Sequence, residues 1–113
     1  MRILVIEEDL MMAHFLKEIL ASLFPGCETG GTYRQESEAL LKEGWDIVVH
    51  GLSSGQNSAM FLQKIKRRYP SIMTVLVMGI LGRDDNANLI VDYVWESPFD
   101  HNPLKEAVKI FFG

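Results

Sequence analysis

Cysteine is almost absent from this chain of 113 residues, which contains only Cys27. One thiol cannot form an internal disulfide or a thiolate metal site, so we expect a reducing, cytoplasmic compartment. No apolar run approaches the ~18 residues that a membrane-spanning helix needs. Basic residues are not in excess either, because 11 Lys and Arg stand against 15 Asp and Glu, for a formal net charge of −4. These absences exclude a disulfide scaffold and a membrane span, and they argue against direct nucleic-acid binding.

Short apolar runs alternate with amphipathic stretches along the chain. Apolar or β-branched runs predict strands at residues 3–6, 47–49, 73–78 and 90–95. Residues 27–32, which carry Glu, Thr and two glycines, are a fifth predicted strand with a weaker pattern. Stretches with apolar residues at helical spacing predict helices at residues 10–23, 37–43, 60–69 and 102–111. Asp9 is the predicted N-cap of the first helix, because its side chain can accept from free backbone N–H groups. The polar stretch 79–89 has room for at most a short helix.

This alternation predicts one α/β domain over residues 1–113. Parallel strands joined through helices form a doubly wound sheet with helices on both faces. In such sheets the functional side chains gather beyond the carboxyl ends of the strands. The candidate site residues at those positions are Glu7, Glu8, His50, Gly51, Met78 and Ser97.

Six short motifs, taken in order, resemble the receiver domain of bacterial response regulators. They are ILVIEED (3–9), EALL (38–41), WDIVV (45–49), MTVLV (73–77), DYV (92–94) and SPF (97–99), so the resemblance covers essentially the whole chain. It implies a flavodoxin-like sheet of five parallel strands in the order 2-1-3-4-5. The fourth helix of the family would be short or missing here. The resemblance also implies a cis peptide bond between Ser97 and Pro98.

The phosphotransfer site of the family is incomplete in this chain. In receivers an Asp at the end of the third strand accepts a phosphoryl group from a histidine kinase, and an acidic pair after the first strand helps to bind Mg²⁺. Glu7 and Glu8 stand at the acidic pair. The acceptor position falls on Gly51 when counted from Asp46, and on His50 when counted back from the following helix. Neither residue is a carboxylate.

The two remaining positions of the receiver site also differ. The family has a Ser or Thr after the fourth strand and a Lys before Pro after the fifth, and these groups read and neutralise the phosphoryl charge. Here the hydroxyl position falls on Met78, and the lysine position falls on Ser97 or Glu96. We therefore expect neither conventional phosphotransfer nor enzymatic activity. A Mg²⁺ cofactor is not expected, and Glu7 and Glu8 are the candidates for holding a cation.

Aromatic and aliphatic residues near the carboxyl terminus form the candidate partner surface. Tyr93 and Trp95 share strand parity, and Ile110 and Phe112 fall outside the buried stripe of the last helix. The expected function is that of an atypical receiver, or pseudo-receiver, which binds a protein without phosphorylation through the face formed by residues 79–113. The expected partner is a histidine kinase, another receiver, an output domain or a second copy of the chain.

Two other functions are compatible with the same site residues. The first is a phosphorelay receiver with a non-standard acceptor, for which His50 is the candidate. Other possible roles for His50 are binding a metal beside the acidic pair and acting as a pH switch. Alternatively, the loss of the Asp and the Lys would leave an emptied pocket for a small ligand between Glu7, Gly51, Met78 and Ser97.

Overall fold

The strands form one sheet in the order β2-β1-β3-β4-β5, and every neighbouring pair is parallel. The computed structural model describes residues 1–32, 44–51, 58–78, 91–96 and 101–113. Its elements, in chain order, are β1 (Arg2–Ile6), α1 (Leu10–Leu23), β2 (Glu28–Thr32), β3 (Ile47–His50), α3 (Ser58–Arg68), β4 (Met73–Met78), β5 (Tyr93–Glu96) and α4 (His101–Phe112). The predicted flavodoxin-like sheet, with its strand order, is confirmed.

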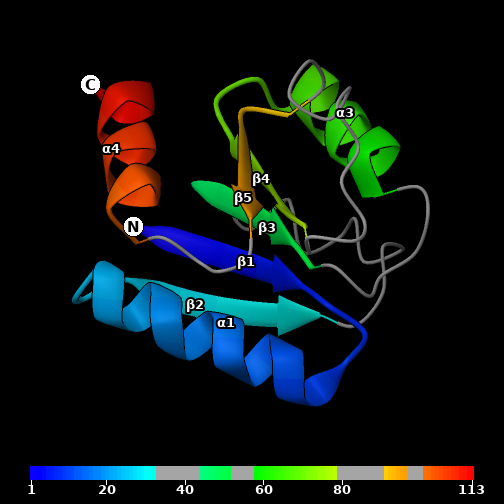
Figure 1. The fold of residues 1–113 in the computed structure, drawn as a ribbon. Coiled ribbons are helices and arrows are strands. Elements are labelled where there is room, and N and C mark those ends of the chain that lie inside the picture. The colour runs from blue at the N-terminus through cyan, green and yellow to red at the C-terminus, as the bar shows by residue number, and fades with distance from the viewer. Residues whose placement is uncertain (33–43, 52–57, 79–90, 97–100) are drawn as a thin grey trace.

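Two apolar clusters lie on the two faces of the sheet. Ile3 and Val5 of β1 pack on the face that α1 and α4 cover, whereas Leu4 and Ile6 pack on the face that α3 covers. Figure 1 shows α1 and α3 on opposite sides of the strands. The central strands are buried on both faces, which explains why they are continuous apolar runs and show no alternation with polar residues.

Helix α1 begins at the predicted N-cap. The Asp9 Oδ1 atom accepts hydrogen bonds from Met11 N at 2.9 Å and Met12 N at 3.1 Å. The helix ends before Phe24, and the chain turns at Gly26, whose φ of 84° suits a residue without a Cβ atom. Both ends of this helix therefore follow from local sequence signals.

Strand β2 contains two glycines that make room for side chains from other elements. A Cβ atom on Gly30 would overlap the Trp45 ring, and one on Gly31 would overlap the end of the Lys17 side chain. The Trp45 ring also contacts Arg2, whose guanidinium lies 4.4 Å from the centre of the ring. The two glycines lower the intrinsic strand propensity of β2, but they allow Trp45 and Lys17 to pack closely against it.

Strand β5 begins later than the apolar pattern predicts. Val91 is buried as the run indicates, but Asp92 uses its side chain and backbone to bond Thr74, and the parallel ladder begins at Tyr93. The predictions for the helix at 37–43, the stretch 79–89 and the Ser97–Pro98 bond lie outside the described residues.

Candidate functional site

The carboxyl ends of β1 and β3 bring Glu7 and Gly51 together. The register pairs Ile6 with His50, and Gly51 N donates a hydrogen bond of 2.7 Å to Ile6 O. Glu7 and Gly51 are each the first residue after their strand. They therefore occupy the place where the family resemblance locates the acidic pair and the acceptor.

The Glu7 side chain fills the space above Gly51. Its carboxylate is fully buried, and Oε1 accepts a hydrogen bond of 3.0 Å from Asp9 N. A Cβ atom built on Gly51 would overlap Oε2 of Glu7. An acceptor side chain at position 51 is thus sterically incompatible with Glu7 as it stands, and the absence of a side chain there makes this arrangement possible.

The His50 side chain lies on the face of the sheet that α3 covers. Its ring is fully buried and meets the ring of Phe61 in α3 edge-on, with centroids 5.7 Å apart. Nδ1 lies 3.2 Å from the carbonyl oxygen of Gly51 and acts as the donor in that bond. Burial lowers the pKa of His50, and the Gly51 carbonyl and the carboxylates of Glu7 and Glu8 oppose that shift. The ring is therefore held as a neutral, packed side chain.

Two of the other predicted site residues differ in burial. Glu8 is exposed, and Met78 is buried at the end of β4, where it pairs with Glu96 in the sheet register. Ser97 lies outside the described residues. Within the described ranges no three His, Cys, Asp or Glu residues come together in a way that could hold a metal ion.

A receiver-type Mg²⁺ site does not fit the side chains that the structure describes at this edge. The Glu7 carboxylate points inward to Asp9 N, and Asp9 itself accepts from the first amides of α1. Both carboxylates therefore stabilise the start of the helix. Position 51 supplies no carboxylate, so of the acidic positions that the resemblance implies only Glu7 and Glu8 remain, with Glu7 buried and Glu8 exposed.

The predicted partner surface divides into an exposed part and a buried part. Ile110 and Phe112 of α4 are 79% and 46% exposed, as expected for an outer helix surface. Trp95 is only 1% exposed, so the prediction that it emerges at the surface is wrong. Tyr93 shares its face as the parity indicates, but α4 covers that face, and Tyr93 packs half-buried against the same cluster.

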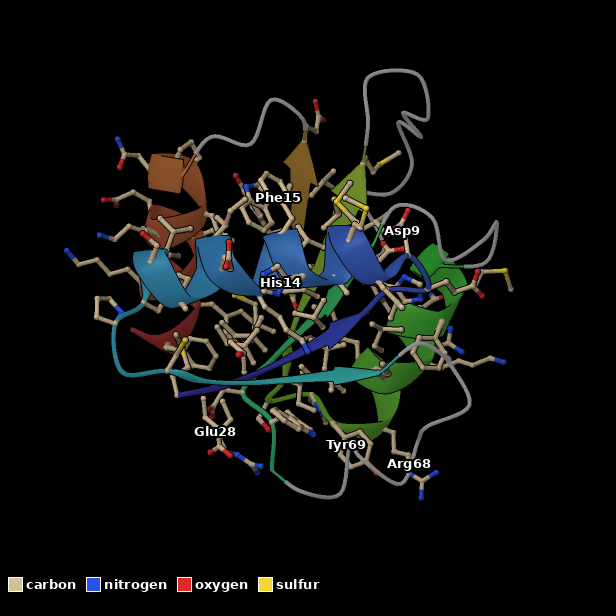
Figure 2. The ribbon with its side chains drawn as sticks, turned by 90° about the horizontal axis from the view of Figure 1, so that it is seen from below. Asp9, His14, Phe15, Glu28, Arg68 and Tyr69 are labelled. Carbon is tan, nitrogen blue, oxygen red and sulfur yellow. The ribbon has the colours of Figure 1, made fainter. Side chains whose placement is uncertain are left out.

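Helix α1 also carries an exposed apolar group, which the sequence pattern alone does not distinguish from the buried residues of the helix. Leu10, Met11 and Phe15 are 62%, 85% and 46% exposed, and Figure 2 shows Asp9 at the start of this helix with Phe15 farther along it. A signal was present, because the apolar residues of α1 occupy more positions than one helix face can bury. Only part of that set is buried, namely Ala13, Leu16, Leu20 and Leu23, while Met12 and Ile19 pack half-buried against the core cluster.

Several solved structures have the same fold as this chain. A receiver domain from Clostridium thermocellum has a TM-score of 0.78 and 22% identity, and the match covers 97% of this chain and 92% of that one. A receiver domain of a DNA-binding response regulator from Colwellia psychrerythraea has a TM-score of 0.78 and 24% identity, with 98% and 97% covered. The fold is that of response regulator receiver domains. No family model and no curated protein matches the chain.

One further structural neighbour was solved in two settings. TrrA from Thermotoga maritima, in complex with Mg²⁺ and BeF, has a TM-score of 0.77 and 22% identity, with 97% of each chain covered. In the complex of TrrA with the histidine kinase ThkA, the match has a TM-score of 0.74 and 24% identity, with 99% and 98% covered.

The helices that the structure describes include none with the length and apolar character to cross a membrane.

Proposed function

We propose that this chain is a pseudo-receiver, a signalling domain of the two-component type that binds a protein partner without being phosphorylated. The receiver fold supports the general class. The placement of Glu7 over Gly51 carries the finer part of the proposal. Where a receiver presents an acceptor carboxylate, this chain has no side chain at position 51, and a neighbouring carboxylate fills the space.

Neither of the other possible functions gains support from the site. As a phosphoryl acceptor, His50 would need an accessible nitrogen, but its ring is fully buried and packed against Phe61. As a pocket for a small ligand, the site would need free space above Gly51, and Glu7 takes that space. We therefore propose a binding domain with no catalytic step and no Mg²⁺ cofactor.

The end of α4 is the proposed contact surface. Large apolar side chains that stay exposed on a small domain are typical of protein interfaces, and Ile110 and Phe112 are such side chains. Candidate partners are a histidine kinase, a receiver, an output domain or a second copy of the chain. The complex of TrrA with ThkA is a precedent, within this fold, for a kinase as partner.

The absence of phosphotransfer is tested with a small phosphodonor. The chain is incubated with acetyl phosphate and Mg²⁺, and intact mass is measured; in parallel, amide shifts are followed with Mg²⁺ and fluoroberyllate. We expect no phosphoryl adduct and no shifts at Glu7, Glu8 or His50. A stoichiometric adduct, or saturable shifts at these residues, would overturn the proposal. A conventional receiver treated in the same way confirms that the donor is active.

The contact surface is tested first for association between copies of the chain. Sedimentation equilibrium is measured over a range of protein concentrations for the wild type, Ile110→Ser and the control Met60→Ser. Met60 is also exposed but lies on α3, on the other face of the sheet. If a second copy is the partner, Ile110→Ser weakens association and Met60→Ser does not. A monomeric wild type at all concentrations leaves the kinase, receiver and output domain as the partners to titrate.

A further inference from the structure

Lys66 of α3 contacts α4 and the residues that precede β4 and β5, at the amino-terminal edge of the sheet. It lies in the last turn of α3, and its Nζ atom is 2.9 Å from Asp92 Oδ2 and 3.0 Å from Ile72 O. The same atom is 4.4 Å from the centre of the Phe111 ring in α4. The ammonium therefore meets a carboxylate, a carbonyl and an aromatic face, and we call Lys66, Thr74, Asp92 and Phe111 the Lys66 cluster.

Asp92 is held in place by Thr74 at the start of β4. Its Oδ2 atom accepts from Thr74 N at 2.8 Å and from Thr74 Oγ1 at 3.0 Å, while Asp92 N donates to Thr74 Oγ1 at 3.0 Å. Thr74 is fully buried, and the Asp92 side chain is 23% exposed. This half-buried carboxylate fixes where the Lys66 ammonium lies, because it accepts hydrogen bonds of defined direction from the backbone.

The contact with Phe111 links the two helical layers. Helices α3 and α4 cover opposite faces of the sheet, so Lys66 reaches Phe111 past the amino-terminal ends of β4 and β5, where Ile72 and Asp92 lie. Phe111 stands between Ile110 and Phe112, and its ring meets the Phe112 ring edge-on with centroids 4.9 Å apart. An ammonium over a ring face is attracted by the negative charge of that face. Phe111 also packs half-buried against the core cluster beneath α4, so the ammonium adds a second contact to a ring that one side of the core already touches.

We propose that Lys66 is a positioning residue for the apolar end of α4. By holding Phe111, it fixes the last turn of α4 and so the direction in which Ile110 and Phe112 face solvent. The inference rests on the proposed function for the use of that surface. Its test measures α4 alone and needs no partner, so a negative result overturns the role of Lys66 and leaves the proposed function standing.

Amide hydrogen exchange of α4 tests the proposal in Lys66→Met, which keeps the apolar stem and removes the charge. The helix ends with a hydrogen bond of 2.9 Å from Gly113 N to Lys109 O, so the amides of residues 111–113 report on the last turn. We expect their protection to fall about fivefold relative to the amides of α1. Lys64→Met, which removes an exposed charge from the same helix, should leave the ratio unchanged.

Two further variants separate positioning from general stability. Lys66→Arg keeps a cation over the ring and should restore most of the protection, whereas Asp92→Asn should lower it by weakening the hold on Lys66. In the wild type, the ε-methylene protons of Lys66 should resonate upfield because of the Phe111 ring current. Unchanged protection in Lys66→Met, or an equal loss in α1 and α4, would overturn the proposal.

Discussion

The two edges of the sheet use carboxylates in different ways. At the amino-terminal edge, Asp46 and Asp92 each stand immediately before a strand, and each accepts the backbone N–H of a neighbouring strand. Asp46 Oδ2 accepts from Arg2 N at 2.8 Å, and Asp92 Oδ2 accepts from Thr74 N at 2.8 Å. The same arrangement therefore joins β3 to the first residue of β1 and β5 to the second residue of β4.

At the carboxyl-terminal edge the carboxylates join a strand to a helix. Glu7 accepts from Asp9 N, and Asp9 accepts from Met11 N and Met12 N at the start of α1. In receivers this edge carries the chemistry, but here Glu7 and Asp9 are used by backbone amides. The comparison teaches that acids at both edges serve backbone amides. Of the predicted acidic pair, Glu7 is used in this way, whereas Glu8 is exposed.

The largest effect is expected from placing a carboxylate at position 51. Gly51→Asp should lower the free energy of unfolding by about 3 kcal/mol, because the new side chain overlaps Glu7 and adds a like charge to a buried place. Urea denaturation measures the change. Combining it with Glu7→Ala should recover at least half of the loss. If Gly51→Asp were as stable as the wild type, the packing of Glu7 over Gly51 would be incorrect.

A smaller loss is expected at the opposite edge from Asp92→Ala. The side chain accepts two hydrogen bonds from Thr74 and forms an ion pair with Lys66. Its removal should therefore lower the free energy of unfolding by about 2 kcal/mol. Asp46→Ala should cost about 1 kcal/mol, since one backbone bond depends on it. Chemical denaturation of both variants ranks them. The reverse order would show that the Lys66 cluster contributes little.

The pH dependence of stability should reveal His50. Its pKa is lowered in the folded chain by burial, so the unfolded chain binds the proton first as the pH falls. The stabilisation is complete above the unfolded pKa of about 6.5 and is lost below it, with a slope of at most about 1.4 kcal/mol per pH unit. Denaturation at several pH values measures this slope. His50→Gln should flatten it, and the exposed His14→Gln should not.

A loss similar to that of Asp46→Ala is expected at the N-cap of α1. Asp9→Ala should lower the free energy of unfolding by about 1 kcal/mol, because two amides of the first turn lose their acceptor. Glu8→Ala is the matched control at an exposed neighbouring acid and should change stability by less than about 0.5 kcal/mol. Equal losses in thermal or chemical denaturation would remove the distinction between these two acids.

Much of the fold could be predicted from the sequence because its signals are local. The runs at β1, β3 and β4 and the N-cap at Asp9 are readable from neighbouring residues, and the structure confirms them. For the candidate site, the sequence predicts that Glu7 and Gly51 follow neighbouring strands and that position 51 has no carboxylate. The structure brings these two residues together. The burial of Trp95 did not follow, because parity indicates which residues share a face but not which helix covers that face.

The sequence by itself determined the order of strands and helices, the face that each strand residue takes and the absence of a carboxylate at positions 50 and 51. Only the tertiary structure decided how those residues are used. It places Glu7 over Gly51, turns His50 toward Phe61, and joins Lys66 to Asp92 and Phe111. The physical reason is that periodicity and capping depend on neighbours along the chain, whereas these contacts depend on how distant segments pack.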